Sequence, residues 1–153
     1  SHIEHFRQRS RYISGTFEWA NLFGSCNRQD SCGNFKDKQA AYPHQNLIKM
    51  DVEDPDDFLQ FLPDGSLVPK ANLRPDAQLK ATETIRLFNL DGSLRQIRET
   101  VIKGYLDTVE TFMDIAAEYD SEDWRPLFEE ELAKANELAF STAIKHTLKL
   151  LIS

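Results

Sequence analysis

Residues 93–119 read SLRQIRETVIKGYLDTVETFMDIAAEY, and this stretch decides the fold class. Its apolar residues recur every three or four positions, the spacing that places them on one face of an α-helix. They are Leu94, Ile97, Val101, Ile102, Tyr105, Leu106, Val109, Phe112, Met113 and Ala116. Gly104 weakens the pattern slightly, because glycine is a poor helix former. The sequence therefore predicts one long amphipathic helix from Ser93 to about Tyr119.

Further helices are predicted on both sides of this stretch. Upstream, apolar residues at helical spacing occupy residues 77–88, between Pro75 and the capping sequence Asn89-Leu90-Asp91-Gly92. Downstream, the spacing predicts two more helices. They run from Asp123, or from Ser121 as the cap, to about Lys134, and from Asn136 to about Leu151. We expect residues 74–153 to form a helical region with apolar surface for its own core and for a partner.

A β-hairpin is predicted within a connecting segment of residues 46–73. Phe58–Phe61 and Ser66–Val68 flank Pro63-Asp64-Gly65, where proline presets one backbone angle and glycine tolerates positive φ. The strands are short and the helices long. The expected fold class is therefore α+β and mainly α, with the hairpin followed by a C-terminal helical bundle.

The first 46 residues give weaker structural signals. Residues 17–23 mix aromatic and apolar side chains, which predicts a short buried helix or turn with Phe17, Trp19 and Phe23 in the core. Residues 25–46 are rich in Ser, Asn, Gly, Asp and Lys. This composition favours a loop broken by a short helix at about residues 35–41.

Composition and charge exclude several classes of protein. No apolar run approaches the roughly eighteen residues of a membrane span, and no secretory signal pattern opens the chain, so a cytoplasmic protein without a membrane partner is expected. The net charge of −7 argues against nucleic-acid binding over the whole surface. Arg7, Arg9 and Arg11 alternate near the N-terminus. Any nucleic-acid contact is therefore expected there.

Residues able to carry chemistry gather in the first 36 positions. Glu4 and His5 are adjacent, and Asn21 follows His5 by sixteen positions. Cys26 and Cys32 lie in a loop-like stretch. Two cysteines this close in a cytoplasmic chain favour metal over a disulfide, although they supply only half of a four-ligand zinc site.

Three motifs resemble those of the HNH endonucleases. They are His2-Ile3-Glu4-His5-Phe6, Trp19-Ala20-Asn21-Leu22, and Ser25-Cys26 through Cys32-Gly33-Asn34-Phe35-Lys36. HNH enzymes typically contain Cys-x-x-Cys, Asp-His-Ile, Asn-Leu and Cys-x-x-Cys-Asn-x-x-Lys, and the first of these is absent here. The segments that follow, 47–58, 62–69 and 81–92, resemble the nuclease subunit of Septu and retron-associated anti-phage systems. The similarity covers most of residues 1–100.

The resemblance implies a ββα-metal nuclease core in residues 1–45, incomplete at its N-terminus. In such a site one residue holds a metal ion, the adjacent histidine, turned the other way, activates water, and an asparagine fixes the loop that carries this base. These roles fall on Glu4, His5 and Asn21. Asn34 is a candidate second metal ligand, with Asp30 and Asp37 as rivals. The implied nucleic-acid contacts are Arg7, Arg9, Arg11 and Lys36.

The chain departs from the HNH pattern at two points. Cys26 and Cys32 are six positions apart, where the family has three, and Gly33 stands where the family has asparagine. His2 could reach the metal ion or DNA, or it could be a strand residue with no chemical task, and we favour the last of these.

Cofactors and partners also follow from the resemblance. Mg²⁺ or Mn²⁺ would serve catalysis, because oxygen ligands suit hard cations, and Ni²⁺ could substitute. Structural Zn²⁺ would bind Cys26 and Cys32, together with a Cys-x-x-Cys upstream of Ser1. The expected partners are nucleic acid, with DNA favoured over RNA, and an ABC-type ATPase subunit that gates the nuclease. A retron reverse transcriptase and its DNA would join this complex.

Two other functions remain open from the sequence. The first is a non-catalytic zinc-binding scaffold, favoured by Gly33 and by the net acidity. The second is an adaptor stabilised by a disulfide between Cys26 and Cys32.

Overall fold

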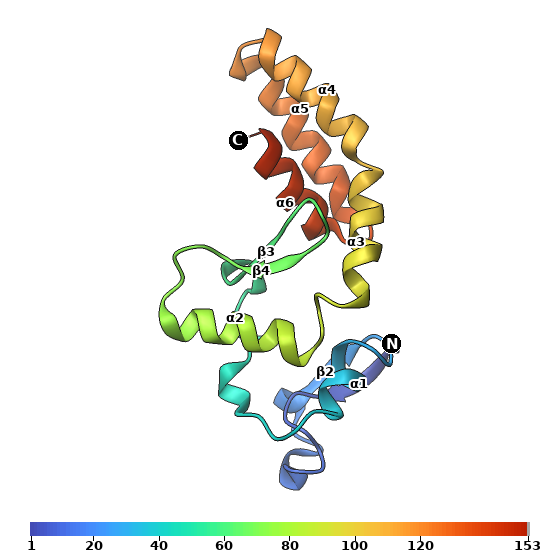
Figure 1. Cartoon of the computed structure of the whole chain (residues 1–153), viewed down its shortest axis with the longest axis vertical. Helices are drawn as coiled ribbons and strands as arrows, with labels where there is room; N and C mark the ends of the chain where they lie inside the picture. The colour runs from blue at the N-terminus through green and yellow to red at the C-terminus, as the bar shows by residue number, and fades with distance from the viewer. Residues whose placement is uncertain (153) are drawn as a thin grey trace. The chain divides into compact units, whose positions relative to one another are not determined.

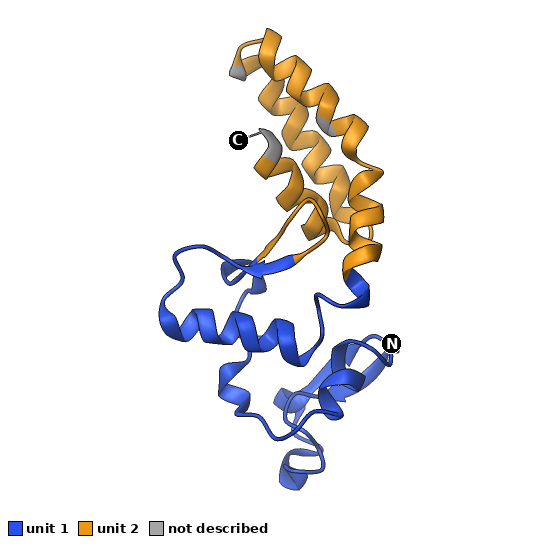
Figure 2. Cartoon of the chain, viewed as in Figure 1, with its two compact units in different colours: residues 1–59, 67–94 blue, residues 60–66, 95–153 orange. Residues whose placement is uncertain are grey.

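The computed structural model describes residues 1–152, except for the side chains of Val109, Ser121, Leu151 and Ile152. The chain divides into two compact units, coloured separately in Figure 2. Unit 1 comprises residues 1–59 and 67–94, and unit 2 comprises residues 60–66 and 95–153. The predicted α+β, mainly helical class is confirmed, since the described residues form six α-helices and two small two-stranded sheets.

Unit 1 begins with a two-stranded sheet followed by a short helix. Strands β1 (His2–His5) and β2 (Leu22–Ser25) pair antiparallel, with Glu4 opposite Phe23 and His5 opposite Leu22. The 3₁₀ turns η1 (Ile13–Gly15) and η2 (Trp19–Asn21) lie between the two strands. Helix α1 (Cys32–Asp37) comes next, and its Gly33 N–H donates to Ser25 Oγ at 3.2 Å. A strand, strand, helix order therefore occupies the first 37 residues.

The remainder of unit 1 is built around helix α2 (Pro75–Leu87), which Figure 1 draws in green. Its start is fixed by Pro75, whose ring suits the first turn of a helix. Before it come η3 (His44–Asn46), η4 (Pro55–Asp57), β3 (Leu59–Phe61) and β4 (Leu67–Pro69), and residues 60 and 61 of β3 already belong to unit 2. The predicted helix and hairpin are thus confirmed. A small core joins the first strand to this helix through Phe6, Leu47 and Leu87.

The structure corrects the prediction for residues 17–23. Phe17 and Trp19 were expected in the core, but 93% and 87% of their surfaces are exposed. The 3₁₀ turn at Trp19–Asn21 points Asn21 inward instead, and Asn21 is only 3% exposed. Phe23 does pack against the core. The short helix expected at about residues 35–41 begins earlier, at Cys32, and ends at Asp37.

Unit 2 contains the C-terminal helices, and the prediction of one long helix there was wrong. Helix α3 (Ser93–Lys103), which belongs to unit 2 from Arg95 onward, ends before Gly104, and α4 (Leu106–Glu118) begins after Tyr105. Tyr105 N–H bonds to Ile102 O at 2.8 Å in a tight turn. Glycine disfavours helix there, and the Tyr105 side chain packs against the core cluster of unit 2.

The last two helices differ in how well they were predicted. Helix α5 (Ser121–Lys134) ends at the predicted residue but begins at Ser121 with Asp120 as its cap, slightly earlier than predicted, and it continues into η5 (Ala135–Glu137). Helix α6 (Ser141–Ile152) begins five residues later than expected, because Leu138 is extended and Phe140 has φ of 59°. Helices α4, α5 and α6 lie side by side (Figure 1). No helix of the described residues is long and apolar enough to cross a membrane.

The core of unit 2 is apolar. Its buried members are Phe112, Phe128, Leu132, Ala135, Ile144 and Leu148. The rings of Phe112 and Phe128 meet edge to face, with centroids 5.5 Å apart. The tip of the second hairpin also belongs to this unit, where Arg98 Nε donates to Gly65 O at 2.7 Å.

Candidate functional site

The two adjacent residues Glu4 and His5 are held on strand β1, which directs their side chains in opposite directions. The Glu4 carboxylate contacts Lys36 of α1. The His5 ring contacts the loop between the strands, where its Nε2 lies 3.0 Å from the carbonyl oxygen of Thr16. The strand therefore separates a carboxylate side from an imidazole side, as the sequence interpretation required.

The contact with Thr16 decides which nitrogen of the His5 ring carries the proton. A carbonyl oxygen only accepts, so Nε2 is the donor in this hydrogen bond. In a neutral imidazole the other nitrogen, Nδ1, then has a free lone pair. That nitrogen is the one able to take a proton from water.

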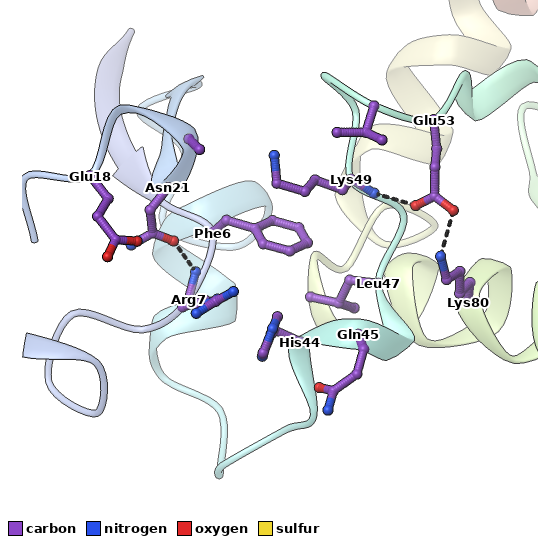
Figure 3. Close-up of a pocket in the computed structure, with 12 residues that line it drawn as sticks. Phe6, Arg7, Glu18, Asn21, His44, Gln45, Leu47, Lys49, Glu53 and Lys80 are labelled. Carbon is purple, nitrogen blue, oxygen red and sulfur yellow. Dashed lines mark hydrogen bonds and ion pairs between the residues drawn. The ribbon is translucent and has the colours of Figure 1, made fainter. Parts of the chain in front are cut away.

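Asn21 fixes the loop that bonds to His5. Its Oδ1 accepts from Arg7 N–H at 2.8 Å, and its Nδ2 donates to Gly15 O at 3.0 Å. Figure 3 shows the bond to Arg7 on one wall of a pocket. The Asn21 carbonyl also accepts from Phe6 N–H at 2.9 Å. One buried side chain thus ties the chain just after β1 to the residue before Thr16.

The Glu4 carboxylate is only 8% exposed and is surrounded by donors. Its Oε1 accepts from His5 N–H at 2.7 Å and lies 3.6 Å from Lys36 Nζ. Its Oε2 lies 3.4 Å from His2 Nε2. A Cβ at position 33 would come within 2.3–2.6 Å of Cγ, Oε2 and Cδ of Glu4, so glycine at this position lets α1 approach Glu4 closely.

Lys36 is fully buried, which corrects the expectation that it contacts nucleic acid. Its ammonium donates to His5 O at 2.6 Å and to Asp37 Oδ1 at 2.7 Å. Together with the neighbouring Glu4, these contacts make Lys36 an internal counter-ion. Its role is therefore to hold α1 against β1.

The structure does not bring Asn34 to Glu4. Asn34 Nδ2 donates to Arg28 O at 3.0 Å, in the loop before α1. His2 Nε2 meets Oε2 of Glu4, although the sequence analysis favoured no chemical role for His2. Within residues 1–152, no three His, Cys, Asp or Glu side chains lie where they could share a metal ion. Glu4 and His2 alone would offer one oxygen and one nitrogen ligand, with water completing the shell.

Cys26 and Cys32 contact each other as free thiols. Burial alone would raise the pKa of Cys26, but hydrogen bonds from Cys32, from the Arg28 backbone and from Ser31 bring that pKa below its usual value. Burial and the contact with Cys26 raise the pKa of Cys32 to about 11. Cys32 also has φ of 56°, an uncommon backbone angle for a residue other than glycine. The pair supplies two ligands of the four that a structural zinc site takes.

The three arginines do not share one strand face. The backbone bends after β1, where Arg11 N–H and Tyr12 N–H both bond to Gln8 O at 3.0 Å. Arg9 and Arg11 are exposed. The half-buried Arg7 lies over the Tyr12 ring, 4.6 Å from its centroid. All three belong to the segment that Asn21 holds.

A pocket of about 390 Å³ lies behind this segment. Figure 3 shows Phe6, Arg7 and Asn21 on one wall and an ion pair between Glu53 and Lys80 at 2.5 Å on the other. His44 lines it as well, and burial followed by the nearby Arg7 charge lowers the pKa of this histidine. The pocket is separate from Glu4, whose carboxylate lies on the α1 side of the sheet.

Comparison with known proteins assigns no family to the chain. No family model matches it, and no curated protein sequence matches it either.

Proposed function

We propose that the chain is a metal-dependent nuclease of the HNH type that hydrolyses phosphodiester bonds. The observation that carries this proposal is the buried Asn21, which clamps the loop whose Thr16 carbonyl orients His5. The order β1, β2, α1 supports it further, since a ββα core has that order. We also propose, from the sequence resemblance to Septu and retron-associated nucleases, that the chain is an effector of anti-phage defence. In this proposal an ABC-type ATPase binds the helical region and gates the nuclease.

In the proposed reaction, His5 takes a proton from a water molecule through Nδ1. The attacking oxygen then approaches phosphorus in line with the leaving oxygen. The bond from Nε2 to Thr16 holds the ring in place, and the positive charge that forms on the ring is stabilised by the Thr16 carbonyl dipole. Asn21 acts through that loop and does not touch the reacting atoms.

The carboxylate of Glu4 and the imidazole of His2 are groups that can bind a divalent ion. Glu4 and His2 would hold Mg²⁺ or Mn²⁺, which would stabilise charge on the phosphate oxygens when bound. Lys36 Nζ lies 3.6 Å from Oε1 and leaves Oε2 to the side of His2. Cys26 and Cys32 would contribute half of a structural zinc site.

The first test compares cleavage by the full-length protein and by His5→Ala. Plasmid and oligonucleotide substrates would be offered with Mg²⁺ or Mn²⁺, in the presence of the ATPase. We expect at least a hundredfold loss of cleavage in the variant, since general-base catalysis contributes about 10²–10⁴-fold. His44→Ala is the matched control, because it removes a half-buried histidine of unit 1 outside the proposed site. Equal cleavage by wild type and His5→Ala contradicts the proposal.

A non-catalytic scaffold is the second candidate, and Lys36 favours it. The buried ammonium already lies beside the Glu4 carboxylate, so this buried carboxylate has a counter-ion without a metal ion. Metal binding and partner binding without cleavage under any activating condition would support this function. Under that outcome the β1, β2, α1 core is a structural platform.

A further inference from the structure

The loop between β1 and β2 displays large aromatic side chains to solvent. Phe17 is 93% exposed, Trp19 87% and Ile13 77%, the highest values among the large apolar side chains that the structure describes, and gathered exposed apolar surface is typical of interaction sites. We call residues 9–20 the aromatic loop. Its exposed rings are surplus to the core of unit 1, which is formed by Phe6, Leu47 and Leu87.

The aromatic loop is held rigidly despite its exposure. Tyr12 OH donates to Glu18 at 3.0 Å, and Thr16 Oγ1 donates to Ile13 O at 2.7 Å. Asn21 bonds to Gly15 O, and a Cβ at position 15 would lie 2.0 Å from the Tyr12 ring. These contacts order the loop backbone that carries Phe17 and Trp19. A backbone ordered in advance loses little conformational freedom when a ligand binds to it.

The charge around these rings is positive in an otherwise acidic chain. Arg9 and Arg11 lie in the loop and Arg7 lies two positions before its first residue, whereas the whole chain carries a net charge of −7. The one acidic residue of the loop, Glu18, accepts a hydrogen bond from Tyr12. The loop thus combines guanidinium groups with flat apolar faces. Its charge complements a polyanion whose own flat faces are accessible.

We infer that the aromatic loop binds a single strand of nucleic acid, with Phe17 and Trp19 as stacking platforms for unpaired bases and the arginines against the phosphates. Aromatic rings stack on any unpaired base, whereas the bases of a duplex already stack on each other. This inference rests on the proposed function and names its substrate class. Thr16, next to Phe17, also accepts the hydrogen bond from His5, so a strand held by the loop lies beside the proposed general base.

Binding can be tested without cleavage, by titration in buffer that contains no added Mg²⁺ or Mn²⁺. The Trp124→Phe variant leaves Trp19 as the remaining tryptophan, and it changes a ring that packs against Phe128 in unit 2. The probes are a twelve-base oligothymidylate, its RNA counterpart, an abasic strand of equal charge and a duplex. We expect the unpaired strands to quench Trp19 fluorescence and the abasic strand and duplex to bind at least tenfold more weakly. The DNA and RNA arms identify which sugar is preferred.

Variants of Phe17 separate stacking from general apolar contact. Phe17→Tyr keeps a ring and should bind the oligothymidylate with the affinity of the wild type. Phe17→Leu keeps apolar volume without a ring and should lose affinity on the order of tenfold, as Phe17→Ala does. Leu79→Ala, at an exposed apolar residue of α2, is the control that should leave affinity unchanged. Full affinity of Phe17→Leu, or equal binding of the abasic strand, overturns the inference.

The outcomes also separate this inference from the proposed nuclease. Strand binding that depends on Phe17 and Trp19, without cleavage in Mg²⁺ or Mn²⁺, supports binding by the aromatic loop and contradicts the proposed nuclease function. Cleavage that depends on His5 but is unchanged in Phe17→Ala and Trp19→Ala supports the nuclease function and overturns the inference that the aromatic loop binds the strand. A protein partner bound through Phe17, with no strand binding, overturns the loop as well.

Discussion

The two units differ in what they bury. Unit 1 buries Glu4, Asn21 and Lys36 in its first 37 residues, and all three are hydrogen-bonded or ion-paired. Unit 2 buries a cluster of aromatic and aliphatic side chains around Phe112 and Leu148. Apolar burial stabilises a fold in proportion to area, whereas a buried polar network adds little net stability and fixes geometry. The comparison suggests that unit 1 is organised for a site and unit 2 for packing.

Breaking the buried ion pair should give the largest effect. Lys36→Met leaves the Glu4 carboxylate buried without its counter-ion, so unit 1 should lose roughly 3–5 kcal/mol of stability. Amide hydrogen exchange, measured separately for each unit, should show the loss in unit 1 alone. The double variant Glu4→Gln/Lys36→Met should regain most of it.

The exposed pair of Lys103 and Glu99 supplies the control for that experiment. Lys103→Met removes an ammonium 63% exposed and should change stability by less than about 1 kcal/mol. If Lys36→Met and Lys103→Met lower stability equally, the buried ion pair of unit 1 contributes no more than an exposed one.

A cavity in unit 2 should have a smaller, purely structural effect. Leu148 is fully buried in α6, and Leu148→Ala should destabilise unit 2 by about 3 kcal/mol through lost packing. Leu150→Ala is the matched control, since Leu150 lies two residues away and is 48% exposed. Thermal unfolding followed by Trp124 fluorescence reports the change. Equal losses for both variants would contradict the helix packing described for α6.

Removing the Asn21 side chain, which clamps the loop, should lower stability less than the Leu148→Ala cavity does but should reduce cleavage. Asn21→Ala deletes the bonds to Arg7 N–H and Gly15 O, and should destabilise unit 1 by about 1–3 kcal/mol. Cleavage should fall by at least tenfold, because the Thr16 carbonyl no longer holds the His5 ring. Asn46→Ala, at a half-buried asparagine of η3, serves as the control. Unchanged exchange at residues 15–17 in Asn21→Ala would mean that Asn21 is not the clamp.

The smallest effect concerns the two thiols. The lowered pKa of Cys26 gives it a thiolate fraction at pH 8, whereas Cys32, with a pKa of about 11, stays protonated. Iodoacetamide should therefore alkylate Cys26 on the order of tenfold faster than Cys32, as read by peptide mass spectrometry. Raising the pH toward 11 should narrow the difference. Similar rates at pH 8 would show that the two thiols are equivalent.

Local signals in the sequence predicted the elements that have local causes. Pro75 and regular apolar spacing placed α2, and Pro63-Asp64-Gly65 placed the second hairpin, where Gly65 has φ of 75°. The sequence also singled out Asn21, and its two side-chain bonds are those of a residue that fixes a loop.

The errors arose where tertiary packing decides the outcome. Spacing alone continued the helix through Gly104, although Tyr105 turns the chain there to reach the core of unit 2. The motif resemblance assigned Lys36 to nucleic-acid contact, but the approach of α1 to β1 buries it. Apolar character placed Trp19 in the core, but the 3₁₀ turn directs Asn21 inward. The spacing of residues along the chain predicts none of these tertiary contacts.

The hairpin tip makes unit 2 discontinuous along the chain. Residues 60–66 leave the ribosome before any of the helices that they join, so unit 2 is incomplete until both segments exist. A fragment that starts at Arg95 would deprive the 3% exposed Arg98 of its bond to Gly65 O, and Arg95 of its ion pair with Asp64. Excising the helices as an independent module therefore requires grafting the seven tip residues back, by circular permutation or as a second polypeptide.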